Sequence, residues 1–282
     1  GNITYMGTVV CRGNVEDGFS IKADGNIEIY GSVGNCHIEA GGDIVISQGV
    51  MGRDEGEIIT SKSVWARFLQ NVKVTAEEYV VVNDNIMNSN VTAMKKILLK
   101  GKRASIIGGH LFATEEITAK NIGSSGGGIE TILEVGFDPK AKLRLQELQE
   151  MQSNVVKQLE EVDLNISTLE NQKKVRRSLP KEKEETLANL RNQRVDLMDS
   201  SEKMTTEINE INAHNRELKV VGCVNASGTV YPGAKILVRD EIDEVRSECK
   251  AVTFYFDSGF VKRKKYEPAQ DSDEMEKPDG YK

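Results

Sequence analysis

Aliphatic residues recur every six positions at the beginning of the chain, in the segment ITYMGTVVCRGNVEDGFSIKADGNIEIYGSV (3–33). They are Ile3, Val9, Val15, Ile21, Ile27 and Val33. Six is a multiple of the two-residue strand period and not of the 3.6-residue helix period, so all of these side chains can point to one side of extended strands. The pattern predicts short strands that each contribute one aliphatic side chain to an interior.

These six-residue frames belong to a longer repeat. Frames that begin with an aliphatic residue, most with Ala or Thr two positions later, start at Ile3, Ile21, Ile38, Ile58, Val74, Val91, Leu111 and Ile129. The starts are 16 to 20 residues apart, and several units contain a third six-residue step. Three faces of about six residues make a turn of about 18, which predicts a triangular parallel β-helix with the small Ala and Thr side chains also inside.

The handedness of this β-helix follows from less direct arguments. Crossovers between parallel strands are strongly biased to the right hand. The variable spacing, with Arg103 and Gly123 where a third aliphatic residue is expected, also differs from the strict hexapeptide repeat of left-handed prisms. We therefore predict a right-handed β-helix, with the left-handed form as the alternative.

A different period begins near Phe137. Mostly apolar residues alternate steps of four and three in two series, which indicates two heptad seams. The first seam contains Ala141, Leu145, Leu148, Gln152, Val155, Leu159, Val162, Ile166, Leu169 and Lys173. The second contains Leu187, Leu190, Arg194, Leu197, Ser201, Met204, Ile208, Ile211, Asn215 and Leu218. Pro180 separates the two and suits a helix start, so the sequence predicts an antiparallel coiled-coil hairpin. The polar seam residues either set the register or mark a thin, partly hydrated coil.

The six-residue pattern returns after the coil in VNASGTVYPGAKILV, with aliphatic residues at Val224, Val230 and Ile236. When residues 137–217 are removed, Val230 follows Ile129 by 20 positions, which equals the longest repeat spacing. The hairpin is therefore predicted to be inserted between adjacent turns, with Ile129 and Val230 stacked on each other.

These patterns divide the chain into four parts. Residues 1–136 and 218–250 form the β-helix, and residues 137–217 form the coiled coil. Residues 251–266 are predicted to form a β-hairpin that caps the β-helix. Residues 267–282 are acidic and contain two prolines, so we expect a disordered tail.

Composition excludes several classes of function. The net charge of −7 argues against a general nucleic-acid binder. No run approaches the ~18 apolar residues of a membrane span, and the chain opens with no signal peptide. The cysteines Cys11, Cys36, Cys223 and Cys249 have no CxxC spacing. They are expected to be free thiols in a reducing cytoplasm rather than disulfides or metal ligands.

The residues that most often carry chemistry do not form a convincing catalytic or metal site. His37 and His110 share one face of the predicted β-helix but lie ~19 Å apart at ~4.8 Å per layer, whereas ligands of one metal ion lie ~2.0–2.1 Å from it. The glycine-rich residues 123–128 lack the Lys-Ser/Thr of a phosphate loop and are expected to form a bend. We predict no catalytic residue, no metal, no cofactor and no small-molecule substrate.

Paired charges recur in equivalent frames. Glu77 with Glu78 and Glu115 with Glu116 point outward from one face, with Lys95 and Lys96 between them. Such carboxylates suit either a glycosidase or a solvated face with alternating charges, and the interposed lysines favour the second interpretation.

Two groups of basic residues are candidate interaction sites. One lies around the turn of the coiled coil and comprises Lys174, Arg176, Arg177 and Lys181. The other lies near the end of the chain and comprises Lys262, Arg263, Lys264 and Lys265. A protein partner is expected at the first group, and the second group suits an acidic protein or lipid surface. For the second group, alternation within a terminal strand or attraction to the acidic tail explains the charges equally well.

A β-helix that is interrupted by one long coiled-coil hairpin, resumes at GTVYPGAKI and ends with VTFYFDSGFVKRKKYEP resembles the flagellar assembly protein A family of bacteria. The resemblance extends from Ile3 to Pro268. It implies a cytoplasmic bacterial protein associated with the assembly or placement of flagella, with no catalytic residues to carry over. Longer members have a further domain before the β-helix, and nothing in this sequence matches that domain, so we expect either a truncated form or a short member. The β-helix is also similar to the polymer-forming bactofilins, which lack the coiled coil.

The leading hypothesis is a non-enzymatic scaffold or adaptor that binds proteins through the β-helix and the coil, with self-association as one mode. The alternative is an acyltransferase on a left-handed hexapeptide prism, with His37 or His110 as general base. A carbohydrate-active β-helix enzyme is a third class, but the chain has neither an export signal nor an aromatic stripe.

Overall fold

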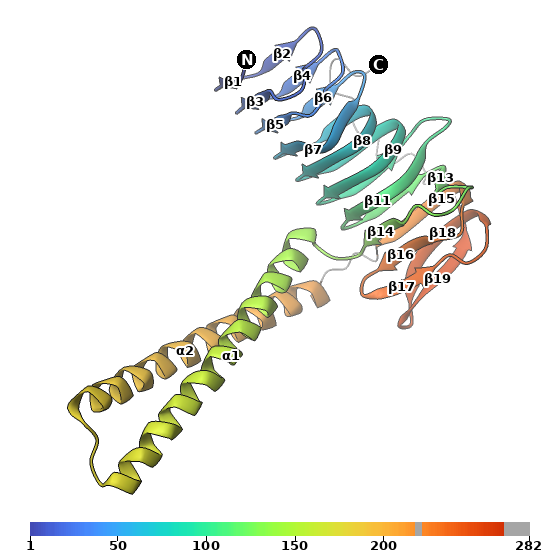
Figure 1. The fold of residues 1–282 in the computed structure, drawn as a ribbon. Coiled ribbons are helices and arrows are strands. Elements are labelled where there is room, and N and C mark those ends of the chain that lie inside the picture. Colours follow the sequence, from blue (N-terminus) through green and yellow to red (C-terminus); the bar gives the residue numbers. More distant parts are fainter. Residues whose placement is uncertain (218–221, 268–282) are drawn as a thin grey trace. The chain divides into compact units, whose positions relative to one another are not determined.

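The computed structural model describes residues 1–217 and 222–267. The chain divides into two units, residues 1–139 with 220–282 and residues 140–219. The first unit contains the strands and the second contains two long helices (Figure 1). The fold is mainly β, with about 45% of residues in strands.

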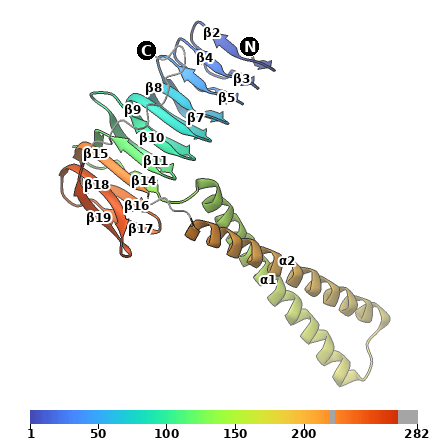
Figure 2. The same cartoon turned by 180° about the vertical axis from the view of Figure 1, so that it is seen from behind.

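The first unit is a parallel β-solenoid of about seven turns with about 19 residues per turn. Figure 2 shows the stacked strands of successive turns from behind. The strands before the helices are β1 (Ile3–Tyr5), β2 (Val9–Cys11), β3 (Ser20–Ala23), β4 (Ile27–Ile29), β5 (His37–Ala40), β6 (Ile44–Ile46), β7 (Val50–Thr60), β8 (Val64–Ala76), β9 (Tyr79–Ala93), β10 (Lys96–Leu99), β11 (Ser105–Ala113), β12 (Glu116–Ala119), β13 (Asn121–Ile122) and β14 (Thr131–Val135). The strands after them are β15 (Cys223–Val230), β16 (Ala234–Val238), β17 (Glu241–Glu244), β18 (Cys249–Asp257) and β19 (Phe260–Lys265).

Three interior columns of paired residues confirm the six-residue pattern. The first face stacks Ile3, Ile21, Ile38, Ile58, Val74, Val91, Leu111, Leu133 and Ile236. The second stacks Val9, Ile27, Ile44, Val64, Val80, Ile97, Ile117, Val224 and Phe254. The third stacks Val15, Val33, Val50, Leu69, Ile86, Ile106, Ile122, Val230 and Cys249. Nearly all of these side chains are buried, so each face contributes one ladder to the core.

The small residues two positions after the first-face column also point inward, as predicted. Buried residues at this position are Ala23, Ala40, Thr60, Ala76, Ala93 and Ala113. Each stacks on its counterpart in the neighbouring turn. On the first face the interior has room for one larger and one small side chain per strand.

Asparagine and aspartate side chains satisfy backbone donors at the bends. Asn14 Oδ1 accepts a hydrogen bond from Ser32 N at 3.0 Å, and Asn26 Oδ1 accepts one from Asp43 N at 2.9 Å. The Asp43 carboxylate in turn accepts from Ser63 N at 3.1 Å. Each bend is therefore tied to the next turn through a side chain where the strand ladder is interrupted.

Another bend uses left-handed backbone conformations in successive turns. Asn71 has φ 49° and Asn88 has φ 45°, and the corresponding position in the next turn is Gly108, with φ 75°. At Gly109, with φ 88°, an added Cβ would lie 2.1 Å from the Ser89 carbonyl oxygen, so only glycine fits.

The predicted stacking of Ile129 on Val230 is wrong. Val230 pairs with Ile122, and Leu133 takes the interior position between Leu111 and Ile236. Ile129 lies before β14 and is 43% exposed. The cause is the glycine-rich bend at 123–128, which takes up more residues than a six-residue frame allows.

The aliphatic residues expected at Arg103 and Gly123 are present three residues and one residue away from these positions. Ile106 and Ile122, rather than Arg103 and Gly123, continue the third face. The insertion still separates adjacent turns, because β12 pairs with β15 and β14 pairs with β16 directly.

Antiparallel strands close the end of the solenoid. β17 pairs with β16, β18 pairs with β15, and β19 pairs with β18 in a hairpin. Ser258 (φ 54°) and Gly259 (φ 87°) form its two-residue turn. Phe254 is fully buried and ends the second-face column, so β18 covers the last interior residues of this face. The predicted tail, from residue 268 onward, lies outside the described residues.

The second unit consists of α1 (Pro139–Arg176) and α2 (Lys181–Glu217). Three contacts show that the helices are antiparallel: Arg144 to Glu207, Gln152 to Thr205 and Arg194 to Asp163. The two seams are buried or half-buried throughout their described lengths, except for the exposed Lys173. Leu218, the last predicted seam residue, lies outside the described residues.

The polar seam residues Gln152 and Arg194 make contacts that favour the register interpretation. Gln152 Nε2 donates to Thr205 Oγ1 at 3.0 Å, and Arg194 Nε donates to Asp163 Oδ1 at 2.6 Å. Both bonds cross from one helix to the other and depend on one alignment of the pair.

Candidate functional site

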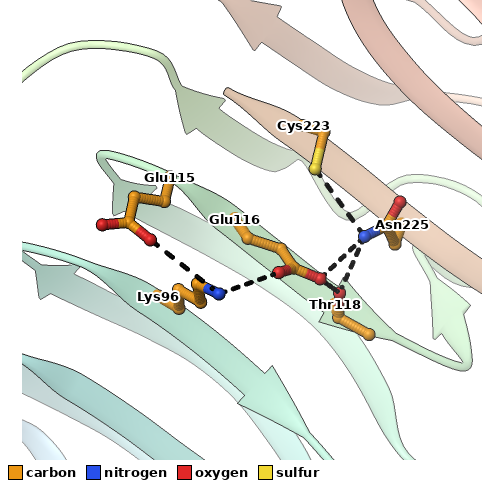
Figure 3. Close-up of polar contacts among 6 residues, drawn as sticks. All are labelled: Lys96, Glu115, Glu116, Thr118, Cys223 and Asn225. Atoms are coloured by element: carbon orange, nitrogen blue, oxygen red, sulfur yellow. Dashed lines mark hydrogen bonds and ion pairs between the residues drawn. The ribbon is translucent and has the colours of Figure 1, made fainter. Parts of the chain in front are cut away.

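The outer side of the second face carries a cluster of polar side chains on consecutive turns (Figure 3). Strand pairing places Lys96 beside Glu116 and Glu116 beside Cys223, and it places Thr118 beside Asn225. The strands come from both sides of the helical insertion. We call Lys96, Glu115, Glu116, Thr118, Cys223 and Asn225 the polar cluster.

Glu116 is the centre of the polar cluster. Lys96 Nζ lies 3.7 Å from Glu116 and 3.8 Å from Glu115. Thr118 Oγ1 donates to the Glu116 carboxylate at 2.5 Å, and Asn225 Nδ2 donates to it at 2.8 Å. The carboxylate is held by a cation and two neutral donors, which fix it in position.

Asn225 links the cluster to the closing hairpin. Its Nδ2 also lies 3.1 Å from Thr118 Oγ1, and its Oδ1 accepts a hydrogen bond from Thr253 Oγ1 at 2.7 Å. The side chains of three successive strands, β12, β15 and β18, are thus joined in one network. Its arrangement suits fixing strands together, because each polar group already has a partner within the protein.

Cys223 is a poor nucleophile in this setting. Desolvation by burial, reinforced by the negative charge of Glu116, raises the pKa of its thiol to about 11. Asn225 Nδ2 lies 3.7 Å from its sulfur. A thiol with so high a pKa is protonated at neutral pH, and the thiolate is the reactive form.

Outward charges along the same face alternate in sign, as predicted for the paired glutamates. Lys95 Nζ lies 3.1 Å from Glu78, and this hydrogen bond raises the pKa of Lys95. With the Lys96 contacts to Glu115 and Glu116, the acidic pairs are joined to cations of the neighbouring turn. The carboxylates therefore act as partners in ion pairs.

The two histidines of the solenoid lie in one outward column of the first face. Four pairing steps connect them, through Glu57, Lys73 and Asn90. His37 Nδ1 is 3.2 Å from Glu57, and His110 Nε2 is 3.1 Å from Glu134. Four steps of ~4.8 Å separate the rings by ~19 Å, so they cannot ligate one ion. Within residues 1–217 and 222–267, no three His, Cys, Asp or Glu side chains are grouped to hold a metal.

The first predicted group of basic residues lies around the turn between the helices. Lys174 and Arg176 end α1, Arg177 adopts φ 59° in the turn, and Lys181 begins α2. All four side chains are exposed. The neighbouring Lys173 pairs with Glu184 across the turn at 3.0 Å.

The second predicted group lies along β19 and is partly engaged within the solenoid unit. Arg263 makes two hydrogen bonds to Asp243, at 2.7 and 2.6 Å, and lies over the Phe254 ring at 5.2 Å. Lys262 pairs with Asp257 at 2.5 Å.

The other two members of this group are exposed. Lys264 lies over the Tyr255 ring at 5.3 Å, and Lys265 ends the strand. Because Arg263 and Lys262 form ion pairs within the protein, fewer positive charges of β19 are available to bind a partner than its sequence suggests.

The sequence did not reveal the network of Thr118, Asn225 and Thr253. These residues are widely separated along the chain and meet only through strand pairing. The signal that was available is the register across the insertion. Aligning Val224 with Ile117, rather than Val230 with Ile129, brings Asn225 beside Thr118.

Comparisons with known proteins support the predicted family. The family described as the Flagellar Assembly Protein A beta solenoid domain matches residues 1–261. A comparison with curated proteins and one with solved structures found no match. The similarity to bactofilins therefore has no support from these comparisons. No helix among the described residues is both long enough and apolar enough to span a bilayer.

Proposed function

Since the chain belongs to the flagellar assembly protein A family, we propose that it is a non-enzymatic scaffold or adaptor in the assembly or placement of bacterial flagella. It acts in the bacterial cytoplasm through protein contacts of the solenoid and the coiled coil. Family membership supports the link to flagella, and the side-chain contacts of the two units support the scaffold role.

The observation that carries the scaffold role is the engagement of the ionisable groups on the solenoid. The carboxylate of Glu116, the imidazoles of His37 and His110, and the thiol of Cys223 all have partners within the protein. Such contacts join neighbouring strands, and the protonated thiol of Cys223 is a poor nucleophile.

The exposed turn of the coiled coil is the proposed contact site. Lys174, Arg176, Arg177 and Lys181 surround it, and Val175 beside them is 84% exposed. Positive charge next to an exposed apolar side chain suits an acidic protein surface that has an apolar patch. Each helix is about 57 Å long at 1.5 Å per residue, so the turn presents these charges far from the ends that join the solenoid strands.

The role in flagella is tested by complementation in the bacterium of origin. A strain that lacks the gene is given the intact chain or one in which a short Gly-Ser linker replaces residues 138–217. Electron microscopy then records the number and position of flagella. We expect a defect in the deletion strain that only the intact chain restores. Normal flagella in the deletion strain would contradict the flagellar role, and full restoration by the shortened chain would contradict the adaptor role of the coil.

The contact site is tested with point variants in the same strain. Reversing the four charges, with Lys174→Glu, Arg176→Glu, Arg177→Glu and Lys181→Glu, is expected to reproduce the defect. The matched control is Lys157→Glu, which reverses an exposed charge on the flank of α1. If the fourfold variant restores flagella as well as the control does, the turn is not the contact site.

A further inference from the structure

Four cations stand together at the bends between the second and third faces of the solenoid. The bend between β10 and β11 carries Lys100, Lys102 and Arg103, and the bend between β12 and β13 is Lys120. Because β10 and β12 are paired, the two bends lie one layer, ~4.8 Å, apart. We call Lys100, Lys102, Arg103 and Lys120 the basic ridge.

The positive charge of the basic ridge is not neutralised within the part of the chain that the structure describes. All four side chains are exposed. Lys120 Nζ donates a hydrogen bond to Lys102 O at 3.0 Å, and no member of the ridge forms an ion pair with a described carboxylate. From residue 97 to residue 129, the acidic residues are the two glutamates of the polar cluster, and both lie beside Lys96. The ridge is therefore a local excess of positive charge on a chain whose net charge is −7.

The outward side of the third face is uncharged beside this ridge. Three consecutive turns contribute one column of Phe68, Asn85 and Ser105 and a second column of Gln70, Met87 and Ile107. All six side chains are half-buried. The bends beyond them hold Asn71, Asn88 and Gly108, which are also uncharged. We call the six residues of the two columns the uncharged face.

The neighbouring residues mark the limits of this surface. In the preceding turn, Met51 is followed by a loop that contains the exposed Asp54 and Glu55. In the bends that continue the line of the ridge, Arg67 pairs with Asp84 at 2.7 Å, so these two residues add no net charge. The excess of positive charge therefore lies at one border of the uncharged face.

We propose that the basic ridge and the uncharged face together bind the surface of a lipid bilayer that contains anionic headgroups. Clusters of lysine and arginine are attracted to such a surface. Partly exposed apolar side chains, here Phe68, Met87 and Ile107, add contact with the boundary between headgroups and acyl chains. A carboxylate within the contact would be repelled by anionic headgroups, and neither the ridge nor the uncharged face contains one.

The geometry favours a bilayer over an acidic protein. Tight protein interfaces depend on large side chains that fill pockets at their centre. Here the cations lie on a bend, and each of the three turns contributes one apolar side chain to the uncharged face. A plane laid on one face of a prism also touches the bend that borders it, so an extended bilayer can contact the ridge and the face at once without a matching shape.

Flotation with vesicles tests the proposal on the full chain. We expect binding to vesicles of phosphatidylcholine mixed with phosphatidylglycerol, no measurable binding to phosphatidylcholine alone, and weaker binding as ionic strength rises. Each cation near such a surface contributes roughly fivefold in affinity. Lys100→Glu with Lys102→Glu and Arg103→Glu should therefore lower the affinity by about 100-fold, with circular dichroism to confirm that the variant is folded.

Two matched controls separate this surface from net charge. Lys62→Glu with Lys157→Glu and Lys250→Glu makes the same change in net charge at exposed positions away from the ridge, and it should lower the affinity far less. Met87→Glu places a carboxylate on the uncharged face and should weaken binding. Thr92→Glu places one at a half-buried outward position of the first face and should not.

Two results with vesicles would overturn the proposal. One is equal affinity of the ridge variant and its threefold control, and the other is equal binding to neutral and anionic vesicles. A poly-glutamate peptide that binds the ridge when vesicles do not would also overturn it, because the partner would then be an acidic protein. Vesicle binding requires no flagellar partner, so these results are independent of the proposed function.

Discussion

The strand register after the glycine-rich bend at 123–128 leads to a prediction about stability. The sequence spacing places Ile129 in the interior, but the structure places Leu133 there instead. Leu133 is fully buried between Leu111 and Ile236. Leu133→Ala removes three carbon atoms, worth ~0.8 kcal/mol each in transfer free energy. It also leaves a cavity in the column, which adds to this loss. The expected loss in the free energy of unfolding is therefore about 3 kcal/mol, within the range for buried leucines.

Ile129→Ala is the matched control. Its side chain is 43% exposed and belongs to no interior column, so the expected loss is below about 1 kcal/mol. Both values come from urea unfolding followed through the fluorescence of Trp65, which lies in the same unit. Equal losses for the two variants, or a larger loss for Ile129→Ala, would show that the chain adopts the spacing-based register instead.

Three further predictions concern the coil and the polar cluster. Leu187 is buried and Arg194 is substantially exposed in its pair with Asp163; Leu187→Ala should cost 2–5 kcal/mol and Arg194→Ala less than about 1 kcal/mol, measured by thermal unfolding at 222 nm. Asn225→Ala should cost about 1–3 kcal/mol, because it leaves buried partners unsatisfied, and faster amide exchange confined to β15 and β18 would report it; unchanged exchange there would contradict the network. The pKa of about 11 at Cys223 lies above the ordinary value of 9.0, so at pH 8 its alkylation should be about 100-fold slower than that of an exposed thiol. The folded thiol keeps its proton while the unfolded one ionises between these two values, so stability should fall as pH rises through that window; mass spectrometry of labelled peptides and unfolding curves at several pH values check both statements.

The sequence alone predicted the interior of the solenoid well, because the columns require one aliphatic residue per face. The six-residue spacing from Ile3 to Val33 therefore maps directly onto three ladders. The predicted stacking of Ile129 on Val230 failed at residues 123–128, because this glycine-rich segment has no pattern of apolar side chains from which the register can be predicted. Ile129 and Leu133 are both aliphatic, and only strand pairing distinguishes them.

A candidate site could be predicted from the sequence when its residues lie close together along the chain, and not when strand pairing brings distant residues together. The exposed charges around Arg177 follow from the helix break that the sequence shows. The engagement of Arg263 by Asp243 depends on β17 and β19 meeting at the closed end, and no spacing signals that. The same holds for the hydrophobic cluster of Val45, Trp65 and Val81, to which three turns contribute one residue each.

The direct pairing of β12 with β15 and of β14 with β16 has a consequence for variation in this family. Strands that precede the helices are thus hydrogen-bonded directly to strands that follow them. The solenoid therefore imposes no constraint on how far the helices extend before they return. Whole heptads can be added to or removed from both arms together while every ladder keeps its register. The length of the two helices can therefore change in evolution independently of the solenoid.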